Sequence, residues 1–355
     1  MLARALGVLC AAGLVLTACA ATPDADESPA ALTSGDTVRL LTYDSYAISE
    51  KTLADFTKET GQEVEIVKAG DAGAMVNRAL LSVDNPEGDV LFGIDNNLSS
   101  RGIDGDLFVE YQAAGIEEVP ADLREATDDR LTPIDTGDVC INTDTAYFDK
   151  NDLAPPQTLQ DLTKSEYRDL LVVQNPGSST PGLAFLLATV AEFGPDGFAS
   201  YWESLRDNGV RVEESWSSAY EQQFSGSSGG GNRPIVVSYA SSPAAEVIFA
   251  AEAPKSAPTA ASLDTCYRQI EYAGVLANSP NETGARQFVD FMLTNTYQED
   301  IPGNNFVYPV LPGATLPPEF DEYAPQPSDP MSLPAPEVAL NRETWVSEWS
   351  SVMQG

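Results

Sequence analysis

The strand–turn–helix pattern on which this chain is built is clearest in residues 233–249, Arg-Pro-Ile-Val-Val-Ser-Tyr-Ala-Ser-Ser-Pro-Ala-Ala-Glu-Val-Ile-Phe. The apolar run 235–237 predicts a buried strand. A polar turn follows, and Ser242 and Pro243 then supply an N-cap and a proline at the first helical position. Open α/β sheets bind ligands where strands end and helices begin. Tyr239, which lies at this junction, is therefore a candidate ligand contact.

The composition is that of a globular protein with more than one domain. The chain has 355 residues, more than a single hydrophobic core usually organises. Its formal net charge is -35, from 54 acidic and 19 basic residues, which disfavours binding to nucleic acid or to an anionic membrane surface. This charge is consistent either with a cationic ligand or simply with a solvated surface. The sequence contains no histidine, which excludes Ser-His-Asp and Cys-His catalysis and imidazole-ligated metal sites.

The N-terminal residues predict export. Arg4 precedes the apolar segment 6–16, which is too short to span a bilayer as a mature helix. The tetrapeptide Leu-Thr-Ala-Cys that ends at Cys19 resembles a bacterial lipoprotein cleavage site. We therefore expect residues 1–18 to be a signal peptide, Cys19 to carry lipid and residues 19–36 to be a flexible tether. The alternative is an ordinary secretory signal with an incidental cysteine. In both cases we expect the protein to be extracytoplasmic. If Cys19 is lipidated, its lipid anchor alone holds the protein at the cell membrane.

Two further cysteines remain in the mature chain. Cys10 leaves with the signal peptide, so Cys140 and Cys266 are the thiols available after lipidation of Cys19. In an oxidising compartment we expect them to form a disulfide, although two separate buried thiols are the alternative.

Strands and helices alternate along the mature chain, which predicts an α/β protein with mainly parallel sheets. The segments 133–148 and 266–275 lack a helical period, so we expect both to be extended. They enter and leave a second series of strands and helices, which predicts two lobes joined by two strands. The expected lobes are 37–137 plus 272–355, and 138–271.

Aromatic and acidic side chains recur where the predicted strands of both lobes end. Flat rings beside carboxylates suit a planar, cationic organic ligand. Helix capping is the alternative role for Asp71 and Asp95, and Ser179 opens a helix whose free N–H groups suit a phosphate. No nucleophile and base are paired and no metal-ligand spacing occurs, so we expect binding without catalysis, metal or cofactor. The candidate ligand contacts are Tyr43, Asp44, Asp71, Asp95, Ser179, Trp216, Tyr220, Tyr239, Phe306 and Tyr308.

Several strings of residues, taken in order, resemble the thiamine-binding proteins of bacterial ABC importers over nearly all of the mature chain. They are Thr-Tyr-Asp-Ser-Tyr at 42–46, Leu-Phe-Gly-Ile-Asp-Asn-Asn-Leu at 91–98, Ser-Thr-Pro-Gly-Leu at 179–183, Trp-Ser-Ser-Ala-Tyr at 216–220, Ser-Tyr-Ala-Ser-Ser-Pro-Ala at 238–244, Tyr-Pro-Val at 308–310 and Trp-Val-Ser-Glu-Trp at 345–349. The resemblance implies a two-lobed type II periplasmic binding protein with two hinge-crossing strands. It also implies a receptor, monomeric in our expectation, that passes thiamine or a thiamine phosphate to an ABC permease and its ATPase.

The resemblance also assigns roles to single residues. It implies that aromatic rings sandwich thiamine, that Asp71 lies close to it, and that Ser179 lies near its polar or phosphorylated end. The corresponding contacts are Tyr43, Asp71, Ser179, Trp216 and Tyr239. This chain has Phe306 where the family has a tryptophan, and Ala245 where the family has a second tyrosine. We expect Tyr220 to fill the space beside Ala245.

Two other functions fit the sequence. One is a receptor for a different ligand, such as a polyamine, a phosphonate or ferric ion, although the Tyr-Tyr pair of ferric-binding relatives is missing. The other is an exported enzyme that processes thiamine-like compounds and shares this fold. Such an enzyme needs a cysteine nucleophile, for which Cys140 and Cys266 are the candidates.

Overall fold

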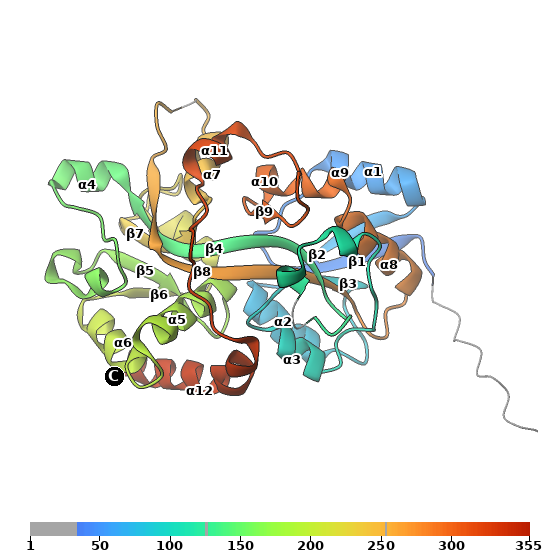
Figure 1. Cartoon of the computed structure of the whole chain (residues 1–355), viewed down its shortest axis with the longest axis horizontal. Helices are drawn as coiled ribbons and strands as arrows, with labels where there is room; N and C mark the ends of the chain where they lie inside the picture. Colours follow the sequence, from blue (N-terminus) through green and yellow to red (C-terminus); the bar gives the residue numbers. More distant parts are fainter. Residues whose placement is uncertain (1–33, 125–126, 253) are drawn as a thin grey trace, which may run out of the picture. The chain divides into compact units, whose positions relative to one another are not determined.

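The computed structural model describes residues 34–124, 127–252 and 254–355, so the predicted signal peptide, Cys19 and most of the predicted tether lie outside it. One mixed sheet runs through the described residues in the order β2-β1-β3-β8-β4-β7-β5-β6, and β9 pairs with β4 (Figure 1). The strands are β1 (Thr37–Thr42), β2 (Glu63–Lys68), β3 (Val90–Asp95), β4 (Thr132–Asp144), β5 (Leu171–Gln174), β6 (Arg211–Glu213), β7 (Ile235–Tyr239), β8 (Thr259–Val275) and β9 (Tyr308–Pro309).

The two longest strands, β4 and β8, pair with each other in antiparallel fashion at the middle of the sheet. On one side β1 pairs in parallel with β2 and β3, and on the other β5 pairs in parallel with β6 and β7. We call the part built on β1–β3 the first lobe and the part built on β5–β7 the second lobe. Two parallel groups joined by two long strands agree with the predicted architecture, whereas the exact lobe boundaries stay a prediction.

Helices cover both faces of the sheet, as the apolar strands require. Side chains alternate between the two faces of a strand. In β1, Val38 and Leu40 therefore pack into the core that contains α1 and α8, while Leu41 packs into the core that contains α2 and α3. The helices are α1 (Glu50–Thr60), α2 (Ala72–Leu81), α3 (Ser99–Asp104), α4 (Thr145–Asn151), α5 (Thr180–Phe193), α6 (Phe198–Asp207), α7 (Ser242–Ile248), α8 (Glu282–Met292), α9 (Asn295–Gln298), α10 (Ile301–Asn304), α11 (Pro318–Tyr323) and α12 (Ala335–Gln354).

The C-terminal helix α12 packs on the second lobe. Its Trp349 ring meets the buried Trp202 ring of α6 edge-on, with centroids 5.7 Å apart. The sequence predicts all of 272–355 in the first lobe. Because α12 also contacts α3 of that lobe, its assignment stays a prediction. None of the helices in the described ranges is long and apolar enough to cross a membrane.

The central strands differ from expectation in length and carry a covalent link. β8 begins at Thr259, before the predicted start at 266. The extended segment predicted at 133–148 stops early, because the Asp144 side chain accepts a hydrogen bond from the Tyr147 N–H at 3.2 Å and begins α4. Cys140 of β4 and Cys266 of β8 are joined by a disulfide. The bond therefore ties together the two strands that connect the lobes.

Candidate ligand-binding site

A cavity of about 770 Å³ lies between the loops of the two lobes. This volume is typical of a site for a small organic molecule. Tyr43 and Asp71 reach it from the first lobe, at the ends of β1 and β2, and Trp216 and Tyr239 reach it from the second, at the ends of β6 and β7. The cavity is thus formed where the strand ends of both lobes meet, as the sequence predicts.

Two stacked rings form one wall of the cavity. Trp216 and Tyr220 have ring centroids 4.8 Å apart and planes inclined by only 10°. Both belong to the segment after β6, which winds into a π-helical turn at Ser218–Gln223. The indole Nε1 of Trp216 donates to the Ser238 hydroxyl at 3.0 Å, and the Tyr220 hydroxyl donates to Glu246 at 2.9 Å. Stacking and these two hydrogen bonds fix the orientation of the Trp216 ring.

Tyr43 and Tyr239 lie close against the backbone, and glycines make room for them. A Cβ atom added to Gly137 would come within 2.8 Å of the Tyr239 ring, and one added to Gly93 would clash with the Tyr43 ring. Gly93 also has a φ of +104°, a conformation that only glycine adopts easily. The Tyr43 hydroxyl donates to Glu271 at 3.2 Å. Both rings are therefore held rigidly at the cavity wall.

Asp71 has two roles that the sequence left as alternatives. Its Oδ1 accepts from the Ala72 N–H at 2.7 Å and caps helix α2. Its Oδ2 accepts from the Trp216 N–H of the other lobe, also at 2.7 Å. Burial raises the pKa of the Asp71 carboxyl, while these two N–H groups act to lower it. The carboxylate caps a helix and lines the cavity at the same time.

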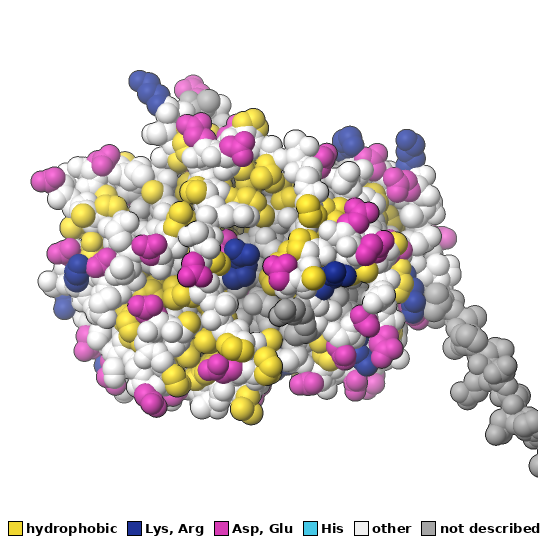
Figure 2. Space-filling view, viewed as in Figure 1, with side chains coloured by type: hydrophobic (Ala, Val, Ile, Leu, Met, Phe, Trp, Pro, Cys, Tyr) yellow, Lys and Arg dark blue, Asp and Glu magenta, His cyan; other side chains and the backbone are white. Residues whose placement is uncertain are grey.

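The charge of the cavity favours cations. Asp71, Glu221, Glu246 and Glu271 line it, and within the described ranges no lysine or arginine does. Acidic side chains also outnumber basic ones on the molecular face drawn in Figure 2. Carboxylates beside aromatic rings attract a positively charged ligand and repel phosphate groups.

Glu271, which lines the cavity, belongs to a buried pair of carboxyl groups. Glu271 of β8 lies opposite Asp135 of β4 in the strand register, and Asp135 is fully buried. Burial, together with the negative charge of Asp95, raises the pKa of Glu271 to about 8. Burial and the neighbouring Glu271 raise the pKa of Asp135 as well. Near neutral pH this pair therefore holds protons that a cationic ligand could displace.

The structure brings together six of the ten predicted ligand contacts. The residues that line the cavity are Tyr43, Asp71, Trp216, Tyr220, Tyr239 and Phe306. The residues outside its lining are Asp44, Asp95, Ser179 and Tyr308. Tyr220 stacks behind Trp216 and reaches Glu246, the neighbour of Ala245, so it lies close to the space that it was expected to fill.

Asp95 and Tyr308 lie outside the cavity because other parts of the protein occupy their polar groups. The Asp95 carboxylate accepts hydrogen bonds from the N–H groups of Asn97 and Leu98 at 3.1 and 3.0 Å, and from the Gln269 amide at 3.1 Å. Asp95 thus stabilises the turn after β3. It does not cap a helix, the alternative that the sequence offered, because the N-cap of α3 is Leu98 and has no side-chain cap hydrogen bond. The Tyr308 hydroxyl donates to the carbonyl of Ala324.

Asp44 and Ser179 lie beside the cavity and not in its wall. The Asp44 side chain accepts from the Gly70 N–H at 3.0 Å, which links two loops of the first lobe. Ser179 is 1% exposed and precedes helix α5. Thr180 and Pro181, the next two residues, line the cavity in its place.

Sequence reasoning missed several residues of the lining, notably Glu271, Phe249 and Asn305. A single acid inside the apolar stretch after residue 269 was a detectable signal for Glu271. Phe249 comes one helical turn after Ala245, is 69% exposed, and packs against Phe306 with ring centroids 4.6 Å apart. Phe306 has a φ of +57°, which is rare for an aromatic residue and is a mark of functional loops.

Two lobes joined by paired strands, with a cavity between the strand ends, define a solute-binding receptor. This chain belongs to the family of bacterial extracellular solute-binding proteins, whose family model matches residues 85–332. The predicted fold class, the two-lobed type II periplasmic binding protein, is confirmed. The protein is accordingly an extracytoplasmic binding protein, while its lipid anchor stays a prediction.

The similarity to particular relatives extends over most of the chain. The thiamine-binding periplasmic protein of Escherichia coli (strain K12) is 32% identical, over 87% of this chain and 90% of the relative. The thiamine-binding periplasmic protein of Brucella suis biovar 1 (strain 1330) is 31% identical, over 88% of this chain and 91% of the relative. The solved structure of a periplasmic thiamin binding protein has a TM-score of 0.78 at 29% identity and covers 91% of this chain and 99% of that one. These findings confirm the family resemblance seen in the sequence.

Proposed function

We propose that this protein captures thiamine outside the cytoplasm and delivers it to an ABC permease. The observation that carries the proposal is a cavity with a fixed Trp216–Tyr220 stack and four acidic side chains in its wall. Thiamine consists of two flat heterocycles, one of which carries a permanent positive charge. Rings stack on such a ligand and carboxylates attract its charge. The similarity to thiamine-binding periplasmic proteins supports the same ligand.

Thiamine without phosphate is the preferred form in this proposal. Each phosphate group adds negative charge to the ligand, and within the described residues no lysine or arginine lines the cavity to receive it. Ser179, which the family resemblance places near the phosphorylated end, lies outside the lining. A buried phosphate without a basic partner is strongly disfavoured.

The transport role includes partners that follow from the family resemblance. The receptor delivers the ligand to a membrane permease, which a cytoplasmic ATPase powers. The cleavage site that ends at Cys19 supports a lipid anchor, which holds the receptor at the membrane surface. We infer a monomer, because a receptor of two lobes contains the whole ligand site within one chain.

The rival functions have less support. An enzyme of this fold needs a cysteine nucleophile in its cleft, whereas Cys140 and Cys266 are joined to each other and neither lines the cavity. A phosphonate receptor is disfavoured by the acidic wall for the same reason as a phosphorylated ligand. A receptor for another organic cation, such as a polyamine, is the remaining alternative.

Titration calorimetry and tryptophan fluorescence test the proposal directly. Purified protein is titrated with thiamine, thiamine monophosphate and spermidine under the same conditions. We expect micromolar or tighter binding of thiamine, and binding of the monophosphate weaker by at least about tenfold, because of the carboxylates in the wall. Failure to bind micromolar thiamine, together with clear binding of spermidine, would overturn the assignment.

A further inference from the structure

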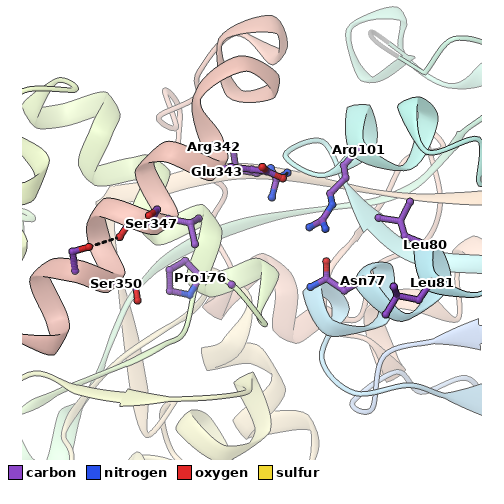
Figure 3. A pocket seen from close by; sticks show the side chains of 12 residues that line it. Asn77, Leu80, Leu81, Arg101, Pro176, Arg342, Glu343, Ser347 and Ser350 are labelled. Carbon is purple, nitrogen blue, oxygen red and sulfur yellow. Dashed lines mark hydrogen bonds and ion pairs between the residues drawn. The ribbon is translucent and has the colours of Figure 1, made fainter.

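A second hollow, of about 640 Å³, lies between α2, α3, α12 and the turn after β5 (Figure 3). We call it the arginine groove, because Arg101 of α3 and Arg342 of α12 line it. Figure 3 shows these two side chains extending from opposite walls toward the same space, with Asn77 of α2 beside them. None of the residues that line the groove lines the ligand cavity.

Arg342 is buried without enough acceptors for its guanidinium group. The residue is 9% exposed, and its Nε atom is buried with no hydrogen-bond partner in the described ranges. One ion pair is present, from Nη2 to Glu343 at 3.4 Å, but the Glu343 side chain is 77% exposed. A pair with so exposed a carboxylate is well screened by solvent and contributes little, and a buried donor without an acceptor is destabilising. The guanidinium group of Arg342 therefore has hydrogen-bonding capacity that its protein neighbours do not use.

Arg101 brings a second positive charge into the groove beside Arg342. Within the described residues, the Arg101 side chain has neither an ion pair nor a hydrogen bond to offset its charge. Burial, and then the charge of Arg101, lower the pKa of Arg342. The carboxylates of Glu343, which lines the groove, and of Asp95 act on Arg342 in the opposite sense. In a chain of net charge -35, two arginines in one groove are still a local concentration of positive charge.

We propose that the arginine groove binds a small oxyanion, of the size and charge of inorganic phosphate, between Arg101 and Arg342. Guanidinium groups present donors in a planar fork that matches two oxygens of a phosphate or a carboxylate. The open groove is large enough for a hydrated anion of this kind. Such an anion accepts hydrogen bonds from the guanidinium groups of Arg101 and Arg342, which line the groove, and neutralises the repulsion between them.

The position of the groove gives the bound anion a structural consequence. Its walls come from α2 and α3 of the first lobe and from α12, which packs on the second. The same α2 donates from the Ala74 N–H to the Ser178 carbonyl of the second lobe at 2.9 Å. An anion between Arg101 and Arg342 therefore bridges the lobes beside an existing contact.

Phosphate binding to the thiamine-free protein tests the site independently of the transport ligand. Melting temperature and calorimetric heats are measured with sodium phosphate, against sodium chloride of equal ionic strength. We expect phosphate to raise the melting temperature by about 2 °C at ten times its Kd. Arg101→Gln and Arg342→Gln should each weaken phosphate binding by on the order of tenfold or more. Glu343→Gln, which removes the competing carboxylate at an exposed position, should tighten it.

Arg78→Gln provides the matched control. Arg78 also lies on α2, but it pairs with Glu87 and does not line the groove, so this change should leave phosphate binding unaltered. If Arg342→Gln fails to fold, Arg101→Gln and Glu343→Gln still decide the question, because both positions are more exposed. Equal effects of phosphate and chloride, or phosphate binding that survives Arg101→Gln, would overturn the proposal.

Discussion

Asp71 of the first lobe accepts a hydrogen bond from the backbone N–H of Trp216 in the second lobe, at a distance of 2.7 Å. The same carboxylate caps α2 through the Ala72 N–H. Both residues also line the ligand cavity. Two residues that line the cavity thus also make a direct contact between the lobes.

Removal of the Asp71 charge should weaken ligand binding more than it weakens the fold. Asp71→Asn keeps one acceptor oxygen and loses the negative charge beside the cation, so we expect thiamine binding to weaken by about 1.5–3 kcal/mol. Asp71→Ala also loses the helix cap, which should lower the free energy of unfolding by about 1 kcal/mol. Calorimetry and urea unfolding measure the two effects. Asp44→Asn, outside the lining, is the control, and equal binding by Asp71→Asn and the parent would contradict the role of the charge.

The stacked wall gives a second prediction. Trp216→Ala and Tyr239→Ala should each weaken thiamine binding by about 1–3 kcal/mol, because each removes a rigid ring from the cavity. Trp216→Phe keeps a ring but loses the hydrogen bond to Ser238, so its effect should be smaller. Fluorescence titration or calorimetry measures these affinities. Tyr147→Ala serves as the control, since its ring packs on Phe148 away from the cavity. Unchanged affinity in both alanine variants would remove the aromatic wall from the binding mechanism.

The sequence predicts the fold well because strand ends carry local signals. Apolar runs that stop at polar turns place Tyr43, Trp216 and Tyr239 correctly at the carboxyl ends of strands. The sequence predicts less well the direction in which a polar side chain at the carboxyl end of a strand points. Asp71 and Asp95 have the same local pattern, yet one lines the cavity and the other turns back onto Asn97, Leu98 and Gln269.

Residues brought together by distant packing were outside the reach of sequence reasoning. Glu271 meets Asp135 only through the pairing of β4 with β8. α12 packs on α6 where Trp349 meets Trp202, and the local sequence does not show that these two rings meet. Phe249 and Phe306 are far apart in the sequence, but their rings are in contact. Phe306 itself has a positive φ, which the sequence does not predict for an aromatic residue.

The disulfide between Cys140 and Cys266 should contribute to stability and not to ligand contact. It links strands 126 residues apart in sequence, and loss of a bond that closes a long loop is expected to lower the free energy of unfolding by about 2–5 kcal/mol. The double variant Cys140→Ser, Cys266→Ser should show this loss in urea unfolding but retain thiamine affinity at low temperature. A thiol assay on mature protein with Cys19→Ser should detect no free thiol before reduction. One reactive thiol would instead favour the enzymatic alternative.

The carboxyl pair of Glu271 and Asp135 should make the ligand-free protein less stable as the pH rises. Their pKa values are raised in the folded state, that of Glu271 to about 8, so folding favours their protonated forms. The stability that they contribute is fully present below their unfolded pKa values, near pH 4, and is lost as the pH rises through about 8. We therefore expect the melting temperature of the ligand-free protein to fall between about pH 5 and about pH 9. Glu271→Gln should flatten this decline.

Bound thiamine should lower the raised pKa of Glu271. The groups around it are Tyr43, Asp71, Asp95 and Asp135, and none of them supplies a positive charge. A bound cation favours the ionised carboxylate, so binding near pH 7 should release a proton, and affinity should rise as the pH increases from about 6 to about 8. Calorimetry in buffers of different ionisation enthalpy counts that proton. Glu271→Gln should bind thiamine more weakly and without proton release, and the idea fails if this variant keeps the pH dependence of the parent.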